Sequence, residues 1–543
     1  MEKIGLAWWK KALVYQIYPL SFKDSNGDGY GDLKGIVSKL DYLKDLGVDV
    51  IWLSPVYQSP MDDNGYDISD YDAIDPIFGT LEDMNNLIHE THQKKMRIIM
   101  DLVVNHTSDE HIWFKEALKS KDNPKRDYYI WADEPSDIGS VFGGSAWEYS
   151  SITNQYYFHL FSKKQPDLNW DNPELRNEIY AMINRWLNKG IDGFRLDVID
   201  LIGKDVKNKQ LSDGPYLIER LQEMNDRCFK HRDIMTVGEM PGISIEKARE
   251  FTSQKNPLLS MIFQFAHVGL DEVPGQGKWM LKKLDLLEFK EVFESLQTKL
   301  YQKGWNSLFL ANHDQPRAVS RYGNLAYRKE SAKMLSTVLY GMQGTPYVYQ
   351  GEEIGMTGVQ FKDIHQYKDI ETINIYNIMK NQGFSEEMIM ESIYAKGRDN
   401  SRTPFQWDDK KNAGFSTGKP WLDVNPNYID INAAFDVKDP SGVFQYFKKL
   451  FSIRKKYDVF HEGNFIPFMK NHPELFGYYR FYGDEKVLVI GSFSNQSLEI
   501  AIPDQIQECL ITNDSRVKVG NKMTIPPYYT CILKIGDELH AND

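Results

Sequence analysis

The first two-thirds of the chain alternates short apolar runs with segments that carry apolar residues at three- and four-residue spacing. Such alternation predicts buried parallel strands joined by amphipathic helices. The eight candidate strands span residues 12–22, 48–56, 96–105, 193–199, 233–240, 259–265, 307–314 and 346–352. Helices are expected between them, as at residues 33–47, 81–95, 172–190 and 326–344, and several end in glycine, a usual helix stop. Eight strands in this alternation favour an α/β fold of the (β/α)8 TIM-barrel type over an open doubly wound sheet.

Two segments break the alternation. Residues 106–170, after the third strand, are too long for a loop and rich in Tyr, Trp, Gly, Ser and Asp, so we expect an inserted subdomain over the barrel mouth. From residue 459 the pattern becomes a series of strands, which predicts a C-terminal all-β sandwich over 459–543. The barrel itself is expected over 1–105 and 171–458.

Composition narrows the class of protein. The 543 residues carry a net charge of -13, which argues against nucleic acid as a partner. Three cysteines, Cys228, Cys509 and Cys531, form no disulfide framework, and we expect free buried thiols, with a Cys509–Cys531 pair left open. No basic segment followed by an apolar stretch begins the sequence, and no apolar run is long enough for a membrane helix, so a cytoplasmic protein is expected.

Polar residues gather where the predicted strands end, which is where a TIM barrel carries its chemistry. These ends read DLVVNH (Asp101, Asn105, His106), GFRLDV (Arg195, Asp197), VGEMPG (Glu239) and NHDQPR (His313, Asp314). One aspartate at a strand end usually caps the next helix. Three carboxylates at one mouth repel one another, and glycoside hydrolysis needs such a set: an acid, a nucleophile or base, and a stabiliser. The set therefore indicates a glycoside hydrolase.

In this order the four segments resemble the signature segments of the α-amylase superfamily. QPDLNW (residues 165–170) resembles its fifth segment, in the form typical of oligo-1,6-glucosidases. The resemblance extends over essentially the whole chain, through SPMDDNGYDISDY, GTPYVYQGEEIGM and KGRDNSRTPFQWD. Oligo-1,6-glucosidases, dextran glucosidases and trehalose-6-phosphate hydrolases are the most similar groups.

The resemblance implies a role for each matching residue. Asp197 would be the nucleophile, Glu239 the general acid/base and Asp314 the stabiliser of a distorted sugar ring. Arg195 would orient Asp197. The implied sugar-binding residues are Asp63, Tyr66, His106, Phe142, Phe161, Gln165, His313 and Arg402. Among them Asp63 and Arg402 would clasp the non-reducing end, so that single glucose units are removed from chain ends.

The residue after the nucleophile is Val198, which in this family accompanies α-1,6 specificity, whereas Ala or Thr accompanies α-1,4. The expected function is thus a retaining exo-α-glucosidase that releases glucose from isomaltooligosaccharides, panose or short dextrans. Leu310 and Ala311 depart from the family pattern at positions expected beside the acceptor site. The short loop after the fourth strand favours dextran glucosidases, whereas GEMPG favours oligo-1,6-glucosidases.

The loop DSNGDGYGD after the first strand presents oxygens at alternating positions, which suits a hard cation. Asp24, Asn26, Asp28, Asp32 and the Tyr30 carbonyl are the predicted ligands of a structural Ca²⁺, which relatives hold in this loop. An ion-free Gly-rich turn is the alternative.

Other functions remain open at this point. A trehalose-6-phosphate hydrolase is the closest rival, although Pro241 and Gly242 replace its usual small hydroxylic pair. A sucrose isomerase or a non-catalytic glucan-binding relative is less favoured. The partner is expected to be a small oligosaccharide, with neither nucleic acid nor membrane, and the chain a monomer, with a dimer not excluded.

Overall fold

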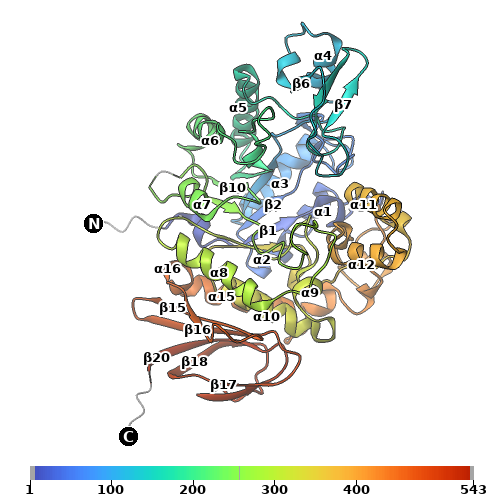
Figure 1. The fold of residues 1–543 in the computed structure, drawn as a ribbon. Coiled ribbons are helices and arrows are strands. Elements are labelled where there is room, and N and C mark those ends of the chain that lie inside the picture. The colour runs from blue at the N-terminus through green and yellow to red at the C-terminus, as the bar shows by residue number, and fades with distance from the viewer. Residues whose placement is uncertain (1–5, 256, 539–543) are drawn as a thin grey trace.

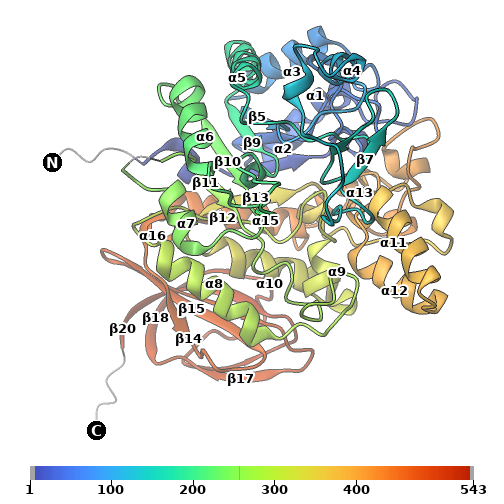
Figure 2. The same ribbon diagram turned by 45° about the horizontal axis from the view of Figure 1, so that its top comes forward.

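The computed structural model describes residues 6–255 and 257–538. Its largest sheet is built from eight parallel strands (Figures 1 and 2). In chain order these are β1 (Val14–Ile17), β2 (Val50–Leu53), β5 (Arg97–Leu102), β9 (Gly193–Leu196), β10 (Met235–Glu239), β11 (Met261–Phe263), β12 (Ser307–Leu308) and β13 (Thr345–Tyr349). They lie side by side in the order β11-β10-β9-β5-β2-β1-β13-β12.

The two edge strands meet, which closes the sheet. Ile262 of β11 pairs in parallel with Asn306, and the Ser307 hydroxyl donates to the Ile262 carbonyl at 2.7 Å. The predicted TIM barrel is confirmed, with all eight strands present. All eight strands are shorter than expected, because the chain leaves the sheet earlier than the apolar runs end. After β1, for example, Pro19 lacks an N–H for a sheet bond and begins a 3₁₀ turn.

Helices cover the outside of the barrel, as the amphipathic segments predict. They are α1 (Leu33–Val37), α2 (Leu40–Leu46), α3 (Leu81–Gln93), α5 (Pro173–Asn188), α6 (Leu217–Met224), α7 (Ile245–Phe251), α8 (Leu286–Leu300), α10 (Arg328–Tyr340) and α15 (Val443–Lys456). Shorter elements complete the connections: β3 (Tyr57–Gln58), β4 (Asp70–Ile74), α9 (Ala318–Tyr322), α13 (Asp399–Arg402), α14 (Ala433–Asp436) and α16 (Val459–Glu462).

The barrel interior is packed with large side chains. Trp52 stacks on Phe263 with ring centroids 5.5 Å apart, and Tyr347 meets Phe263 edge-on at 4.6 Å. These rings belong to a buried cluster contributed by facing strands. Because they fill the middle of the barrel, polar chemistry is confined to its mouth.

The segment 106–170 contains its own small sheet beside the barrel mouth (Figure 1). It holds α4 (Ile112–Lys119), β6 (Trp131–Ala132), β7 (Trp147–Ser150) and β8 (Gln155–Phe158), with the strands antiparallel in the order β6-β8-β7. The segment returns to the barrel where Leu168 N–H donates to the Asn105 carbonyl at 2.8 Å.

A helical pair that the sequence pattern did not predict follows β13. It consists of α11 (Ile370–Asn381) and α12 (Glu386–Lys396) and buries its own apolar cluster. Its isoleucines are spread around α11, with Ile373 and Ile378 exposed, so the helical period is weak in sequence. Asn374 of α11 donates to the Phe142 carbonyl at 3.1 Å, which joins this pair to the 106–170 segment.

The C-terminal part is all-β, as predicted. It contains β14 (Ile466–Phe468), β15 (Leu475–Tyr482), β16 (Glu485–Ser492), β17 (Leu498–Ala501), β18 (Asp504–Thr512), β19 (Lys522–Ile525) and β20 (Thr530–Glu538). Five strands form one antiparallel sheet, β14-β15-β16-β20-β18, and β17 pairs with β19. Figure 1 shows these strands below the barrel, on the side of α8 and α10. All three cysteines are free thiols, so the alternative Cys509–Cys531 bridge is not formed.

A buried arginine joins the C-terminal sheet to the barrel. Arg480 of β15 donates to the Gly463 carbonyl at 2.7 Å and the Gly341 carbonyl at 3.2 Å. Arg454 of the barrel helix α15 donates to the neighbouring Met342 carbonyl at 2.7 Å. Gly341 and Met342 follow the C-terminus of α10, where the helix dipole favours positive charge. Within residues 6–255 and 257–538, no helix combines the length and apolar character that a membrane crossing requires.

Candidate active site

Three carboxylates from neighbouring strands meet around one guanidinium. Arg195 of β9 is 1% exposed, and its Nη1 lies 2.6 Å from Asp101 Oδ1 and 2.5 Å from Asp197 Oδ1. Its Nη2 lies 2.6 Å from Glu239 Oε2. The strand register explains the meeting, because Arg195 is level with Asp101 of β5 and Val237 of β10. The structure therefore brings the predicted nucleophile and acid/base together.

The charge balance of this cluster favours retention of a proton. Burial raises the pKa of Asp197, the Arg195 guanidinium opposes that shift, and Glu239 and Asp101 raise the pKa again. One guanidinium cannot balance three ionised carboxylates away from water. A cluster that holds one proton beside an ionised carboxylate has the two forms that general acid and nucleophilic catalysis require.

Val198 turns the chain sharply after Asp197. Its φ of 36° and ψ of 43° place a β-branched residue in the left-handed region, which is strained for such a side chain. In this conformation Val198 N–H donates to Glu239 Oε2 at 3.2 Å. The side chain packs beside Phe161 against the apolar cluster of the 106–170 segment. The strained turn thus couples the two catalytic candidates through the backbone.

Asp314 lies in a more open part of the same mouth. Its Oδ2 is 3.1 Å from His313 Nε2, and its Oδ1 is 2.6 Å from Arg402 Nη2 and 3.3 Å from Arg398 Nη1. Burial alone would raise its pKa, but His313, Arg398 and Arg402 hold the pKa of Asp314 well below its ordinary value. Asp314 is therefore an ionised carboxylate at neutral pH. Its side chain is 28% exposed, against 9% for Asp197 and 7% for Glu239.

The partner of Asp63 differs from the sequence prediction. Asp63 Oδ1 lies 3.1 Å from Arg398 Nη2, whereas Arg402, the predicted partner, contacts Asp314. Arg398 also lies 2.6 Å from the buried Asp369. The two arginines are four residues apart on one helical turn, so both side chains face the same way. That spacing in KGRDNSR was the signal that could have identified Arg398.

Aromatic and imidazole rings line the pocket between these charges. The Tyr66 ring is parallel to the His313 ring, with centroids 5.1 Å apart and 7° between the planes, and Tyr66 donates to Asp101 Oδ2 at 3.1 Å. The ring centroids of Phe161 and His106 are 5.3 Å apart, and those of Phe142 and Phe161 are 5.7 Å apart.

Gln165 links the remaining predicted residues. Its amide nitrogen lies 3.2 Å from Asp63 Oδ2 and 3.2 Å from His106 Nε2, and Arg398 covers the Phe142 ring at 5.0 Å. Burial lowers the pKa of His106 to about 4, so its ring is neutral near pH 7. All the predicted catalytic and sugar-binding residues therefore belong to one connected group.

Lys204 contacts two residues next to this group and was not identified from the sequence. Its Nζ lies 2.7 Å from Asn105 Oδ1 and 3.1 Å from Asp167 Oδ2, and its side chain is 3% exposed. Asn105 in turn lies 3.1 Å from His106 Nδ1. The ammonium therefore sits where the 106–170 segment returns to the barrel. No spacing pattern marks a single lysine in a loop, so this contact required the fold.

One further expectation changes with the structure. Leu310 and Ala311 are buried, at 3% and 2% exposure. Leu310 lines a small apolar void with Leu335 and Leu339 of α10, so it packs between the barrel and that helix rather than beside an acceptor site.

The predicted calcium loop is folded on its own main chain. Asp24 accepts from the N–H groups of Asn26 and Gly27, and Asp32 caps α1 by accepting from Gly35 N–H. Burial alone would raise the pKa of Asp24, but these donors and the Ser416 hydroxyl lower it, so the carboxylate is ionised. Asn26 Nδ2 donates a hydrogen bond to Asp28 Oδ2 at 3.0 Å. Within the described residues no three Asp, Glu, His or Cys side chains are grouped tightly enough for a metal ion.

We predict that Lys204→Met weakens both the fold and the pocket. Loss of the ammonium leaves Asp167 as an unpaired buried charge, which should reduce the free energy of unfolding by about 3 kcal/mol. Without the contact from Lys204, Asn105 no longer fixes the position of His106. We therefore expect kcat/KM to fall by about tenfold. Denaturant unfolding and steady-state kinetics measure the two effects.

Lys209→Met is the matched control, since Lys209 lies on the same loop and pairs with Asp137 at the surface. It should change the unfolding free energy by less than about 0.5 kcal/mol. Equal behaviour of the two variants would contradict a supporting role for Lys204.

Comparison with known proteins agrees with this geometry. Residues 16–463 match the family model described as alpha amylase, catalytic domain, and residues 475–532 match the alpha-amylase SusG C-terminal domain. An oligo-1,6-glucosidase of Bacillus cereus is 52% identical over 98% of this chain and all of its own length. A glucan 1,6-alpha-glucosidase of Streptococcus pneumoniae is 52% identical over 96% of this chain and 98% of its own.

Among solved structures, the trehalose-6-phosphate hydrolase of Bacillus licheniformis superposes with a TM-score of 0.93. It is 46% identical and covers 98% of this chain and all of its own. The family model alone spans most of the sequence and includes every catalytic candidate. Its agreement with the barrel and with the carboxylates at the barrel mouth shows that the chain belongs to the alpha-amylase family.

Proposed function

We propose that this protein is a retaining exo-α-glucosidase that hydrolyses α-1,6-glucosidic bonds at the non-reducing ends of isomaltooligosaccharides, panose or short dextrans. The observation that carries the proposal is the shared guanidinium of Arg195, which holds Asp197 and Glu239 on its two terminal nitrogens. Asp314 lies at the same mouth with its charge secured by Arg402. These are the three carboxylates that glycoside cleavage needs.

The contact of Asp197 and Glu239 with the two terminal nitrogens of one guanidinium keeps the two side chains close together, which supports retention of anomeric configuration. Retaining enzymes place their two carboxyl groups about 5 Å apart, too close for an intervening water. Asp197 would attack the anomeric carbon while Glu239 protonates the leaving oxygen. Glu239 would then take a proton from the water that releases the glucosyl group from Asp197.

Exo cleavage is supported by a charged pair at Asp63, the residue that the resemblance places at the non-reducing end of the sugar. Asp63 and Arg398 are paired there, and Phe142 packs on Arg398. A carboxylate and a guanidinium offer an acceptor and donors to the hydroxyls of one terminal glucose. Tyr66, beside His313, offers a ring face to the same sugar.

The linkage is argued from the relatives and from Val198. Oligo-1,6-glucosidase and glucan 1,6-alpha-glucosidase are the names of two 52% identical relatives. Hydrolysis of trehalose 6-phosphate is the alternative, and a phosphate would need free cations. Instead Arg398, Arg402 and Lys278 each contact a carboxylate, Lys278 at 2.7 Å from Glu371.

The deciding experiment compares initial rates of glucose release from isomaltose, panose, maltose and trehalose 6-phosphate. We expect isomaltose and panose to be cleaved fastest, and Asp197→Ala to lower kcat by at least about 10⁴-fold. Addition of azide to that variant with an activated α-glucoside should yield a β-glucosyl azide, because azide fills the face that Asp197 leaves. Glucose release from trehalose 6-phosphate alone would replace the proposal with its alternative.

The variant Val198→Ala should shift the linkage preference toward maltose. Loss of two methyl groups beside the leaving-group side should change the isomaltose-to-maltose ratio of kcat/KM by about tenfold. Val206→Ala is a matched control. Val206 packs against the same apolar cluster as Val198, but it is not next to Asp197 in the sequence. An unchanged ratio in Val198→Ala would remove Val198 from the explanation of specificity.

We also propose that the loop of Asp24, Asn26, Asp28 and Asp32, with the Tyr30 carbonyl, binds Ca²⁺ as a structural ion. Its oxygens alternate along the loop, and small rotations of Asn26 and Asp28 would turn them inward. Ca²⁺ at 100 times its dissociation constant should stabilise the protein by about 2.7 kcal/mol. Thermal unfolding in Ca²⁺ and in EGTA measures this, with Asp28→Ala expected to abolish the difference. Identical unfolding of the unaltered protein in both would contradict the site.

A cytoplasmic location and a monomeric state stay predictions from the sequence.

A further inference from the structure

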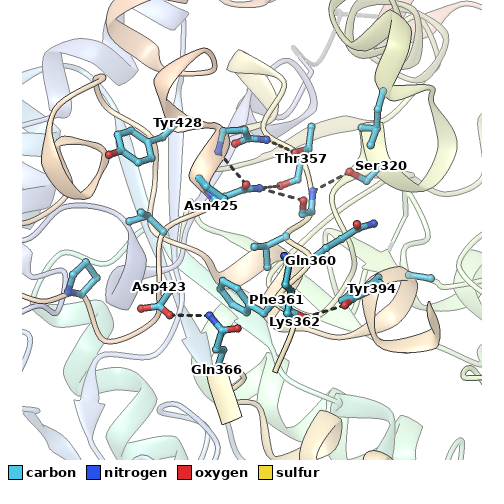
Figure 3. A pocket seen from close by; sticks show the side chains of 18 of the residues that line it. Ser320, Thr357, Gln360, Phe361, Lys362, Gln366, Tyr394, Asp423, Asn425 and Tyr428 are labelled. Atoms are coloured by element: carbon cyan, nitrogen blue, oxygen red, sulfur yellow. Dashed lines mark hydrogen bonds between the residues drawn. The ribbon is translucent and has the colours of Figure 1, made fainter. Parts of the chain in front are cut away.

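A cavity shown in Figure 3 lies apart from the catalytic group. Its volume is about 990 Å³, within the range of ligand sites. None of the catalytic or sugar-binding candidates lines it. The cavity is open to solvent and is lined by residues of α9, the loop 357–362, α12 and the loop 420–428, among them Ser320, Thr357, Gln360, Tyr394, Asn425 and Tyr428.

Hydrogen bonds fix the wall of this cavity. Asn425 donates to the carbonyls of Thr357 and Gly358 at 3.2 and 3.1 Å. Asn427 donates to the Thr357 hydroxyl at 2.8 Å, and Gly358 N–H donates to the Ser320 hydroxyl at 2.8 Å. Figure 3 shows these bonds joining the two loops and α9. The wall is therefore formed before any ligand arrives, which reduces the entropy that binding loses.

Several polar groups on the wall are left for a ligand. Within the described residues the side chains of Gln360, Lys362 and Tyr428 make no hydrogen bond, and Gln360 and Lys362 are exposed. Asp423 uses one carboxylate oxygen to accept from Gln366 at 3.3 Å and keeps the other free. The cavity therefore presents an amide, a phenol, an ammonium and a carboxylate oxygen.

Two ring faces accompany these groups. Tyr394 and Tyr428 are both half-buried and line the cavity, and Tyr394 is held in place by its hydrogen bond to the Phe361 carbonyl at 3.0 Å. A tyrosine ring whose hydroxyl edge contacts water can bind ligands that combine an apolar face with hydroxyl groups. A pyranose ring has such a face on each side and hydroxyls around its rim.

The charge of the lining argues against an anionic ligand. Lys362 is the cation of the lining, and Asp423 and Glu391 are acidic. The chain as a whole carries a net charge of -13. A phosphate or carboxylate would therefore meet repulsion, whereas a neutral polyol would meet none.

We propose that this cavity is a second saccharide-binding site that holds a segment of α-1,6-glucan away from the catalytic pocket. The choice of an α-1,6-glucan rests on the proposed function, while the neutral saccharide class rests on the lining. Gly358 on the cavity wall lies beside Asn400 of α13, because a Cβ placed on Gly358 would be 3.6 Å from that side chain. Arg398 and Arg402 belong to the same helical turn as Asn400. They contact Asp63 and Asp314, respectively, in the catalytic group. A long chain bound here keeps its non-reducing end close to the active site and raises the effective concentration of that end.

The test measures dextran binding without turnover. Native gel electrophoresis of Asp197→Asn in gels containing graded dextran gives an affinity from the retardation. The double variant Gln360→Ala, Tyr428→Ala in this background should bind dextran about tenfold more weakly. Tyr149→Ala is the control, since Tyr149 is an exposed tyrosine (49%) on the 106–170 segment.

A kinetic arm uses the same changes in the active enzyme. The double variant should raise KM for dextran several-fold and leave kcat/KM for isomaltose unchanged. Unaltered dextran retardation and KM would overturn the proposal. An equal loss on isomaltose would also overturn it, because the residues would then act through the catalytic pocket. If neither substrate is hydrolysed, the proposed function fails, and retardation that still depends on Gln360 and Tyr428 would show the saccharide site independently.

Discussion

The active site depends on one buried positive charge. Arg195 is nearly inaccessible to water and lies within 2.6 Å of Asp101, Asp197 and Glu239. Removing such charges from water costs several kcal/mol per ion unless each has a partner. The carboxylates therefore require the guanidinium, and the guanidinium requires them. This mutual requirement fixes the ends of β5, β9 and β10 relative to one another, and it places the reacting groups without help from flexible loops.

The same principle repeats with other ion pairs around the same barrel mouth. Arg398 and Arg402 stabilise Asp63, Asp314 and Asp369, and Lys204 stabilises Asp167. Each cation comes from a connection after a strand, whereas most of its partners come from another connection. The pocket is thus assembled by charge pairing between segments that are distant in sequence. The strained backbone at Val198 is held by the contact of Arg195 with Asp197 and by the hydrogen bond from Val198 N–H to Glu239.

The barrel and the gathering of the candidate catalytic carboxylates at its mouth could be predicted from sequence because they have local signals. Each buried strand is a short apolar run, and the motifs around Asp197, Glu239 and Asp314 are contiguous. The direct partner of Asp63 had no such signal, since both Arg398 and Arg402 fit the pattern and only the packing selects Arg398. Lys204 was missed for the same reason. The α11–α12 pair was missed because its apolar residues are spread around the helix, and Leu310 was placed wrongly because adjacent strand residues point to opposite sides of the sheet.

The pair of Asp63 and Arg398 at the non-reducing end of the sugar sets an order of departure for proposed exo cleavage. Glucose freed by the reaction lies deeper than the shortened chain, so the shortened chain must leave first. An enzyme built in this way cannot slide along one polymer through successive cuts. Each glucose released therefore requires a chain end to enter the catalytic site again, and a chain held at the proposed second saccharide site supplies its own end.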